Sequence, residues 1–240
     1  MLPAARLVVT KLVSSLHRRG LVGTLKSCAG EIQDIWFDRR LGIDTLETTR
    51  DWSLPEVPFG IRYQPTKIAR LKKIFRELRI NFEDYVFLDL GSGKGRALLI
   101  ASEFPFKRII GVEVLSELHL ISEKNIRAYR STTQKCRAIE SNCCDATLYQ
   151  MPPENMVLFL SNPFEHPIVS RVLANLKESL KSYPREVYFV YHNPVCSDLI
   201  IRSGFLEVVR TTDLYAIYRN KMPASRSGIN GFAEAPSHRD

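Results

Sequence analysis

A glycine-rich turn between a short apolar stretch and a helical pattern constrains this sequence more than any other feature. The stretch 86–90 is apolar apart from Asp89, and Gly91, Gly93 and Gly95 follow at once. Glycine allows a tight turn and lets backbone N–H groups approach a ligand without a side chain between them. The helix that follows presents free N–H groups and a partial positive charge, which suit a carboxylate or a phosphate. The turn is therefore either a ligand-binding loop or a purely structural turn.

Short apolar stretches alternate with helical patterns along the rest of the chain. Continuous apolar strands separated by helices are typical of a parallel sheet that is covered on both faces. The last two strands must pair antiparallel, because the few residues between them cannot form a parallel crossover. We therefore predict an α/β fold with a doubly wound, mostly parallel seven-stranded sheet, a C-terminal antiparallel hairpin and an N-terminal helical extension. The predicted strands are 86–90, 108–114, 138–141, 157–160, 187–191, 206–210 and 214–218, and the predicted helices are 65–78, 96–103, 116–130, 168–182 and 197–203.

The length of the chain suits one such domain with extensions. A single hydrophobic core grows comfortably to about the size of these 240 residues. Residues 1–59 are predicted to form an N-terminal helical extension or lid, and residues 60–220 the α/β domain. Residues 221–240 are rich in Ser, Pro, Gly and Ala, so we predict a disordered tail there.

Charge and cysteine content bear on the partners and the compartment. The net charge of +8 permits an acidic partner, such as nucleic acid or an anionic membrane surface, although basic residues also simply keep a surface solvated. Residues 1–27 predict a basic amphipathic helix that either touches a membrane surface weakly or packs on the domain, and we expect packing. The five cysteines form no C-x-x-C pair, so we expect no disulfide framework, no metal site and a cytoplasmic location. No apolar stretch approaches the roughly 18 residues of a transmembrane helix.

Two acidic residues lie where strands of such a sheet end. Glu113 ends the second predicted strand, 18 residues after Gly95, where an acidic side chain accepts ribose hydroxyls in this topology. Asp145 follows the third predicted strand, where a carboxylate can accept a hydrogen bond from an adenine amino group. A dinucleotide such as NAD is the competing ligand, but its G-x-G-x-x-G pattern requires glycine where this chain has Arg96. Tyr63 precedes the domain, where a lid would cross the ligand or an aromatic ring would simply pack.

These residues resemble the class I S-adenosylmethionine (SAM)-dependent methyltransferases over about residues 60–220. The first motif of that family, acid-x-Gly-x-Gly-x-Gly, matches Asp89, Gly91, Gly93 and Gly95, and its next two acidic positions match Glu113 and Asp145. The resemblance implies that the loop from Gly91 through Ser92 to Gly95 lies under the methionine part of SAM. It also implies that Glu113 holds the ribose, that Asp145 faces the adenine and that S-adenosylhomocysteine (SAH) is the product.

The end of the fourth predicted strand is the candidate acceptor site. Asn162, Pro163 and Phe164 resemble the Asn/Asp-Pro-Pro-Tyr/Phe motif of amino-group methyltransferases, with one proline missing. The Asn162 oxygen can accept a hydrogen bond from an attacking amine, Pro163 stiffens the turn, and the Phe164 face can stabilise positive charge. The alternative is an ordinary Asn-Pro turn. His192, after the fifth strand, is either a base or a structural histidine.

The sequence therefore predicts a SAM-dependent methyltransferase that acts on a nitrogen acceptor, with a protein side chain or a small amine favoured. The basic charge keeps an RNA or DNA methyltransferase open, although no RNA-binding module is recognisable. A SAM-binding protein without catalysis is the third alternative. One fold hosts many substrates, so the fold alone does not choose among these functions.

Overall fold

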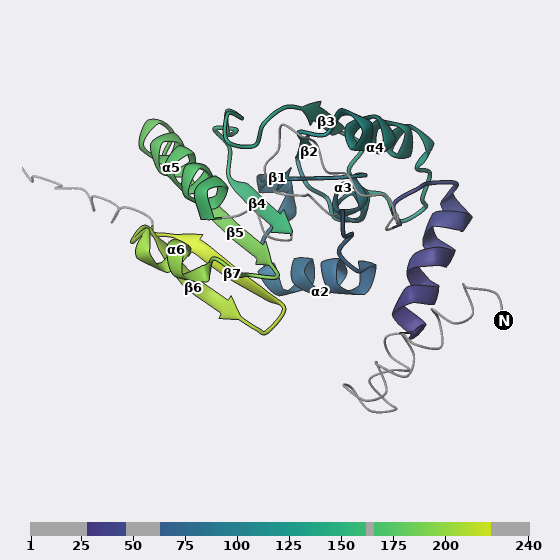
Figure 1. The fold of residues 1–240 in the computed structure, drawn as a ribbon, viewed down its shortest axis with the longest axis horizontal. Helices are drawn as coiled ribbons and strands as arrows, with labels where there is room; N and C mark the ends of the chain where they lie inside the picture. The colour runs from purple at the N-terminus through teal and green to yellow at the C-terminus, as the bar shows by residue number, and fades with distance from the viewer. Residues whose placement is uncertain (1–27, 47–62, 162–165, 222–240) are drawn as a thin grey trace, which may run out of the picture.

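A seven-stranded sheet with helices on both faces forms the centre of the molecule (Figure 1). The computed structural model describes residues 28–46, 63–161 and 166–221. The order of the strands across the sheet is β3-β2-β1-β4-β5-β7-β6. Their bounds are β1 Val86–Leu90, β2 Arg108–Glu113, β3 Ile139–Cys143, β4 Met156–Ser161, β5 Val187–His192, β6 Leu206–Thr211 and β7 Tyr215–Asn220.

The strand directions confirm the predicted fold class. Strands β1 to β5 pair parallel with their neighbours, and β7 pairs antiparallel with both β5 and β6. The helices of the domain are α2 Ile68–Leu78, α3 Arg96–Ala101, α4 Ser116–Ala128, α5 His166–Ser182 and α6 Ser197–Arg202, with a 3-10 turn η1 at Phe82–Asp84. A further helix covers residues 28–41 before the domain. No helix among the described residues is long and apolar enough to cross a membrane.

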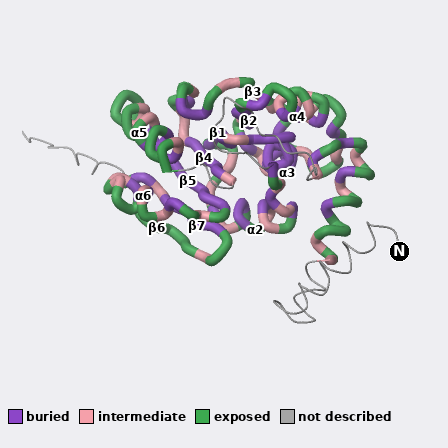
Figure 2. Tube along the Cα trace, in the orientation of Figure 1, coloured by how far each residue is buried: buried purple, intermediate pink, exposed green. Residues whose placement is uncertain are grey.

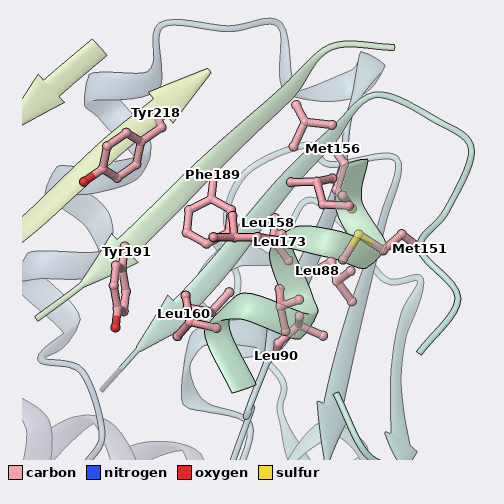
Figure 3. Close-up of a cluster of buried hydrophobic side chains, with 14 of the residues drawn as sticks. Leu88, Leu90, Met151, Met156, Leu158, Leu160, Leu173, Phe189, Tyr191 and Tyr218 are labelled. Atoms are coloured by element: carbon pink, nitrogen blue, oxygen red, sulfur yellow. The ribbon is translucent and has the colours of Figure 1, made fainter. Parts of the chain in front are cut away.

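The sheet separates two hydrophobic cores, because alternate side chains of a strand point to opposite faces. On one face, Leu88 and Leu90 of β1 pack with residues of β4, β5 and α5 (Figure 3). On the other face, Phe87 packs with α2 and α3, and its ring lies 5.3 Å from that of Phe75. Figure 2 shows buried residues concentrated along the central strands and exposed residues on the outer sides of the helices. Burial of each large apolar side chain contributes about 1.5–3 kcal/mol, so the central strands are held firmly.

Helix α2 begins at Ile68, three residues later than the predicted start at residue 65. Lys67 has extended backbone angles, and the Ile68 N–H donates to the Asp34 carboxylate at 3.3 Å. An acidic side chain that accepts from a free N–H at a helix start stabilises that start. This acceptor comes from the helix over residues 28–41, a contact that helical spacing cannot predict.

The topology brings several strand ends to one edge of the sheet. The order of the parallel strands reverses at β1, whose neighbours are β2 on one side and β4 on the other. A crevice opens at such a switch point, outside the carboxyl ends of the strands. Leu90 of β1 is aligned with Val112 and Leu160, and Ser161 of β4 is aligned with His192. The residues that follow these strands therefore share one edge.

Candidate active site

The glycine turn is fixed to the end of β2 through backbone hydrogen bonds. The N–H groups of Gly91 and Ser92 both donate to the Val112 carbonyl, at 2.8 and 3.0 Å. Gly93 has a φ of 54°, and a Cβ at this position would lie 2.3 Å from Cε2 of Tyr63. Gly95 has a φ of 83°, and a Cβ there would lie 2.4 Å from the Ser122 hydroxyl. Glycine at these two positions is therefore required by close approach as well as by conformation.

Glu113, the last residue of β2, is bound directly to this turn. Its Oε2 accepts from the Gly93 N–H at 2.7 Å, and its Oε1 accepts from the Leu115 N–H at 2.9 Å. Burial raises the pKa of the Glu113 carboxyl, while the backbone hydrogen bonds act in the opposite direction. An ionised carboxylate offers about four lone-pair sites. Glu113 can therefore also accept hydrogen bonds from the hydroxyls of a ligand.

Asp89 and Ser92 carry buried polar atoms that have no partner among the described residues. These atoms are Oδ1 of Asp89 and the hydroxyl oxygen of Ser92. Burial, and then the nearby Glu113 carboxylate, raise the pKa of Asp89 well above its usual value. Buried polar groups are almost always hydrogen-bonded, so orphaned atoms beside a glycine turn fit a ligand that brings polar groups of its own.

Tyr63 covers the turn from the N-terminal side of the domain. Its ring lies against Gly93, and its hydroxyl donates to the Thr45 carbonyl at 3.0 Å. Burial raises the pKa of the Tyr63 hydroxyl, which therefore stays protonated and remains a donor. Of the two roles expected for Tyr63, a lid across the ligand or a packed ring, the structure shows the ring packed against the turn.

Asp145 lies at the same sheet edge as Glu113 and is exposed. Cys143, the last residue of β3, is aligned with Glu113, and the Cys144 N–H donates to the Glu113 carbonyl at 3.1 Å. The Asp145 Oδ1 accepts from the Thr147 N–H at 2.7 Å, which orients this carboxylate. The structure thus brings both acidic residues to one rim, as the sequence predicted from the strand pattern.

His192 lies at the adjoining rim, where β4 and β5 end. Its Nε2 is 2.8 Å from Nη1 of Arg70, and its Nδ1 is 3.0 Å from the hydroxyl of Ser161. Burial, and then the Arg70 charge, lower the pKa of His192 to about 4. Because a guanidinium only donates, Nε2 accepts and Nδ1 carries the proton. Both ring nitrogens are therefore engaged, and a role as a base would require Arg70 to leave Nε2.

The Ser161 hydroxyl is held from two sides. Besides His192, it contacts the buried Thr66 hydroxyl at 2.5 Å. The three predicted acceptor-site residues that follow Ser161, namely Asn162, Pro163 and Phe164, lie outside the described residues. The structure therefore fixes the position of the strand end that leads into this motif.

The part of the chain that contains the glycine turn is similar to a known protein family. The family model described as "Histone methylation protein DOT1" matches residues 61–144, which include Tyr63, the glycine turn and Glu113. That family belongs to the class I SAM methyltransferases. This part of the chain, residues 61–144, is therefore similar to a family of class I SAM-dependent methyltransferases. No curated protein matches the sequence.

Several solved methyltransferase structures are similar to this chain. An RNA methyltransferase from Salinibacter ruber in complex with SAH is 19% identical, with 74% of this chain and 99% of that chain covered and a TM-score of 0.43. A putative RNA methyltransferase from Pyrococcus horikoshii is 18% identical, with 78% and 96% covered and a TM-score of 0.49. A precorrin-6y C5,15-methyltransferase from Geobacter metallireducens is 16% identical, with 67% and 92% covered and a TM-score of 0.49.

The residues present fit SAM. SAM brings an ammonium group and ribose hydroxyls as donors, and the carboxylates of Asp89 and Glu113 are acceptors beside the turn. The Tyr63 ring packs directly on Gly93 and so forms a wall beside these acceptors. SAM supplies an electrophilic methyl group on a sulfonium, and the protein supplies the alignment of this group with an acceptor.

Two buried cations beside the turn were missed by the sequence interpretation. Lys94 and Arg96 have side chains that are 0% and 2% exposed, and their charged groups contact the segment 34–46. The sequence does contain one indication of a buried cation: Arg96 is the one charged residue of the otherwise apolar helix α3. The identity of its partners could not be predicted, since they lie in a segment with no recognisable motif.

We predict that Gly93→Ala will weaken SAH binding by at least roughly tenfold, because the added Cβ displaces Tyr63 from the turn. Gly42→Ala is the matched control, since Gly42 also has a positive φ of 63° but no atom within 4 Å of an added Cβ. Both variants carry left-handed strain of about 1–2 kcal/mol, and only the first carries the clash. Calorimetric titration with SAH measures the difference. Equal affinities for the two variants would contradict the prediction.

We predict that His192 makes the protein less stable in acid. Its pKa in the folded state is about 4, below the usual 6.5, so the unfolded chain binds the proton first. Stability is therefore fully retained above about pH 6.5 and lost as the pH falls toward 4; between about pH 7 and pH 5 the loss is about 2 kcal/mol. Urea unfolding of the wild type and His192→Gln at both pH values measures this loss. A variant with the same pH dependence as the wild type would show that another group is responsible.

Proposed function

We propose that this protein is a methyltransferase that holds SAM between the glycine turn, Glu113 and Asp145, and transfers the methyl group to a nitrogen of a protein side chain or a small amine. The observation that supports this best is the buried Glu113 carboxylate, which binds Gly93 while keeping acceptor capacity. In this arrangement the ribose hydroxyls donate to Glu113, and the adenine lies toward the exposed Asp145. The domain limits of 60–220, with an extension over 1–59 and a tail over 221–240, are part of the same proposal.

The methionine part of SAM is proposed to lie over the segment Gly91–Gly95, beside Tyr63. The orphaned Asp89 Oδ1 accepts from its ammonium group, and the Ser92 hydroxyl is free to donate to its carboxylate. The Tyr63 ring excludes water from this side of the pocket, since it lies against Gly93. Exclusion of water strengthens each of these polar contacts.

The acceptor is proposed to enter beyond the carboxyl end of β4. Ser161 is fixed by His192 and Thr66, so the chain enters Asn162 from an anchored position. The Asn162 oxygen accepts a hydrogen bond from the amine and turns the lone pair of the nitrogen toward the methyl group. Phe164 stabilises the positive charge that develops on that nitrogen. Most of the rate enhancement then comes from alignment.

Two other functions remain as alternatives. The net charge of +8 permits an RNA or DNA acceptor, because basic residues neutralise phosphates, although this acceptor is not the favoured one. A SAM-binding protein without catalysis requires only the cofactor half of the site. A cytoplasmic location is proposed because all five cysteines are free.

The ribose assignment predicts that Glu113→Ala will raise the dissociation constant of SAH about ten- to a hundredfold, the equivalent of 1.5–3 kcal/mol for hydrogen bonds to a charged group. Glu123→Ala is the control, since Glu123 forms only an exposed ion pair with Arg127. Calorimetric titration of both variants with SAH provides the test. An unchanged affinity of folded Glu113→Ala would place the ribose elsewhere.

The acceptor class is tested with radiolabelled SAM in a lysate that is then divided between protease and nuclease. We expect the label to be lost on protease treatment or to be found in small amines. Label lost to nuclease would replace the proposal with a nucleic-acid methyltransferase, and no transferred label would favour a protein that only binds SAM.

With the labelled acceptor in hand, Asn162→Ala should lower single-turnover methyl transfer at least roughly tenfold, or about 1.4 kcal/mol of barrier. SAH affinity should change far less, because Asn162 is proposed to face the acceptor. Asn162→Asp keeps an acceptor oxygen and should retain more activity than Asn162→Ala. Full turnover by folded Asn162→Ala would mean that the motif is only a turn.

A further inference from the structure

A buried ionic cluster joins the first residue of α3 to the N-terminal segment. Nε of Arg96 donates to the Thr45 hydroxyl at 2.7 Å, Nη1 lies 3.2 Å from the Asp34 carboxylate, and Nη2 lies 3.7 Å from the Asp38 carboxylate. All four of these residues are buried. Arg96 follows Gly95 directly, so the cluster adjoins the turn that is proposed to bind SAM.

Thr45 connects this cluster to the wall of the proposed cofactor pocket. Its N–H and its hydroxyl both donate to the Asp38 carboxylate, at 2.5 and 2.7 Å. Its carbonyl accepts from the Tyr63 hydroxyl at 3.0 Å. One residue thus links the Arg96 guanidinium, through its own backbone, to the ring that lies against Gly93.

A second cation of the turn is held by the same segment. Nζ of the fully buried Lys94 donates to the Asp44 carboxylate at 2.8 Å and to the Leu46 carbonyl at 3.1 Å. It also lies 5.6 Å from the centre of the Tyr63 ring. The N-terminal segment therefore contacts the turn on both sides of Gly95, through Lys94 and Arg96.

We propose that Arg96 is a positioning residue for the cofactor: together with Asp38 and Thr45, it fixes Tyr63 against Gly93, so that the wall of the SAM pocket is formed before SAM binds. This inference rests on the proposed binding of SAM at the glycine turn. Arg96 acts through Thr45 and Tyr63 and does not itself touch the cofactor. The helix over residues 28–41, which lies to the side of the sheet in Figure 1, thereby becomes part of the binding machinery.

The chemistry of the cluster favours positioning over simple stabilisation. A buried ion pair is weak evidence for stability, because desolvation of the charges offsets much of their attraction. A planar guanidinium instead offers donors in a fixed geometry, which an ammonium cannot reproduce. Arg96 uses this geometry to hydrogen-bond Thr45 through Nε while Nη1 and Nη2 form ion pairs with Asp34 and Asp38, the latter without a hydrogen bond. A preformed pocket also avoids the cost of ordering Tyr63 when the ligand binds.

The test measures SAH affinity and thermal stability together in the full chain. Arg96→Lys keeps the charge but loses the planar arrangement of guanidinium donors, and it should weaken SAH binding at least roughly tenfold. Thr45→Val removes only the hydroxyl, keeps the carbonyl that accepts from Tyr63, and should weaken binding by a smaller factor while remaining folded. Arg108→Lys is the control, because Arg108 pairs with Glu140 and Glu154 at the opposite end of β2. Its SAH affinity should equal that of the wild type.

A double-mutant cycle with Tyr63→Phe distinguishes positioning from a general loss of structure. Tyr63→Phe keeps the ring but removes the bond to Thr45, so Arg96→Lys or Thr45→Val added to it should cause little further loss of affinity. If the fold losses of SAH affinity in the single variants simply multiply in the double variants, the inference is overturned. Folded variants with lower melting temperatures and the affinity of the wild type would also overturn it. Failure of the wild type to bind SAH would instead overturn the proposed function, and the inference with it.

Discussion

The hydrogen bond from the Gly93 N–H to the Glu113 carboxylate is the contact on which the rest of the site depends. It joins the turn after β1 to the last residue of β2, so it fixes the two neighbouring strand ends that border the crevice. The bond is buried, where a charge-assisted hydrogen bond is stronger than in water. Gly93 also has no side chain, which is the reason that Tyr63 can lie so close to the turn. Carboxylate, turn and ring therefore form one unit.

The adjoining rim of the sheet is organised by a neutral histidine. Arg70 occupies Nε2 of His192, and this choice of tautomer directs the Nδ1 proton to Ser161. The positive charge of the Arg70 guanidinium would repel a protonated His192 ring. The contact therefore favours the neutral form of His192. The strand that leads into Asn162 is thus held by uncharged hydrogen bonds.

Much of this site could be predicted from the sequence. Asp89, the three glycines and Glu113 lie within or directly after short apolar strands, and the alternation of strands and helices places those strand ends at one edge. Asp145 followed from the same logic. By contrast, the start of α2 at Ile68 depends on a cap from Asp34, and local helical spacing contains no information about a cap from a distant segment. Arg96 and Lys94 were overlooked because charged residues are usually solvated, whereas here both are buried against acidic partners.

The sequence by itself determined the class of fold and the chemistry of the turn, because hydrophobic periodicity and glycine conformation act over a few neighbouring residues. Only the tertiary structure decided what surrounds them. The Arg96 guanidinium meets Thr45 across 51 residues of chain, and the His192 imidazole meets Arg70 across 122 residues. Such contacts depend on how the N-terminal segment and α2 pack against the sheet. Packing also decided that Tyr63 lies against Gly93, because the clash that excludes a side chain there exists only once the two segments have come together.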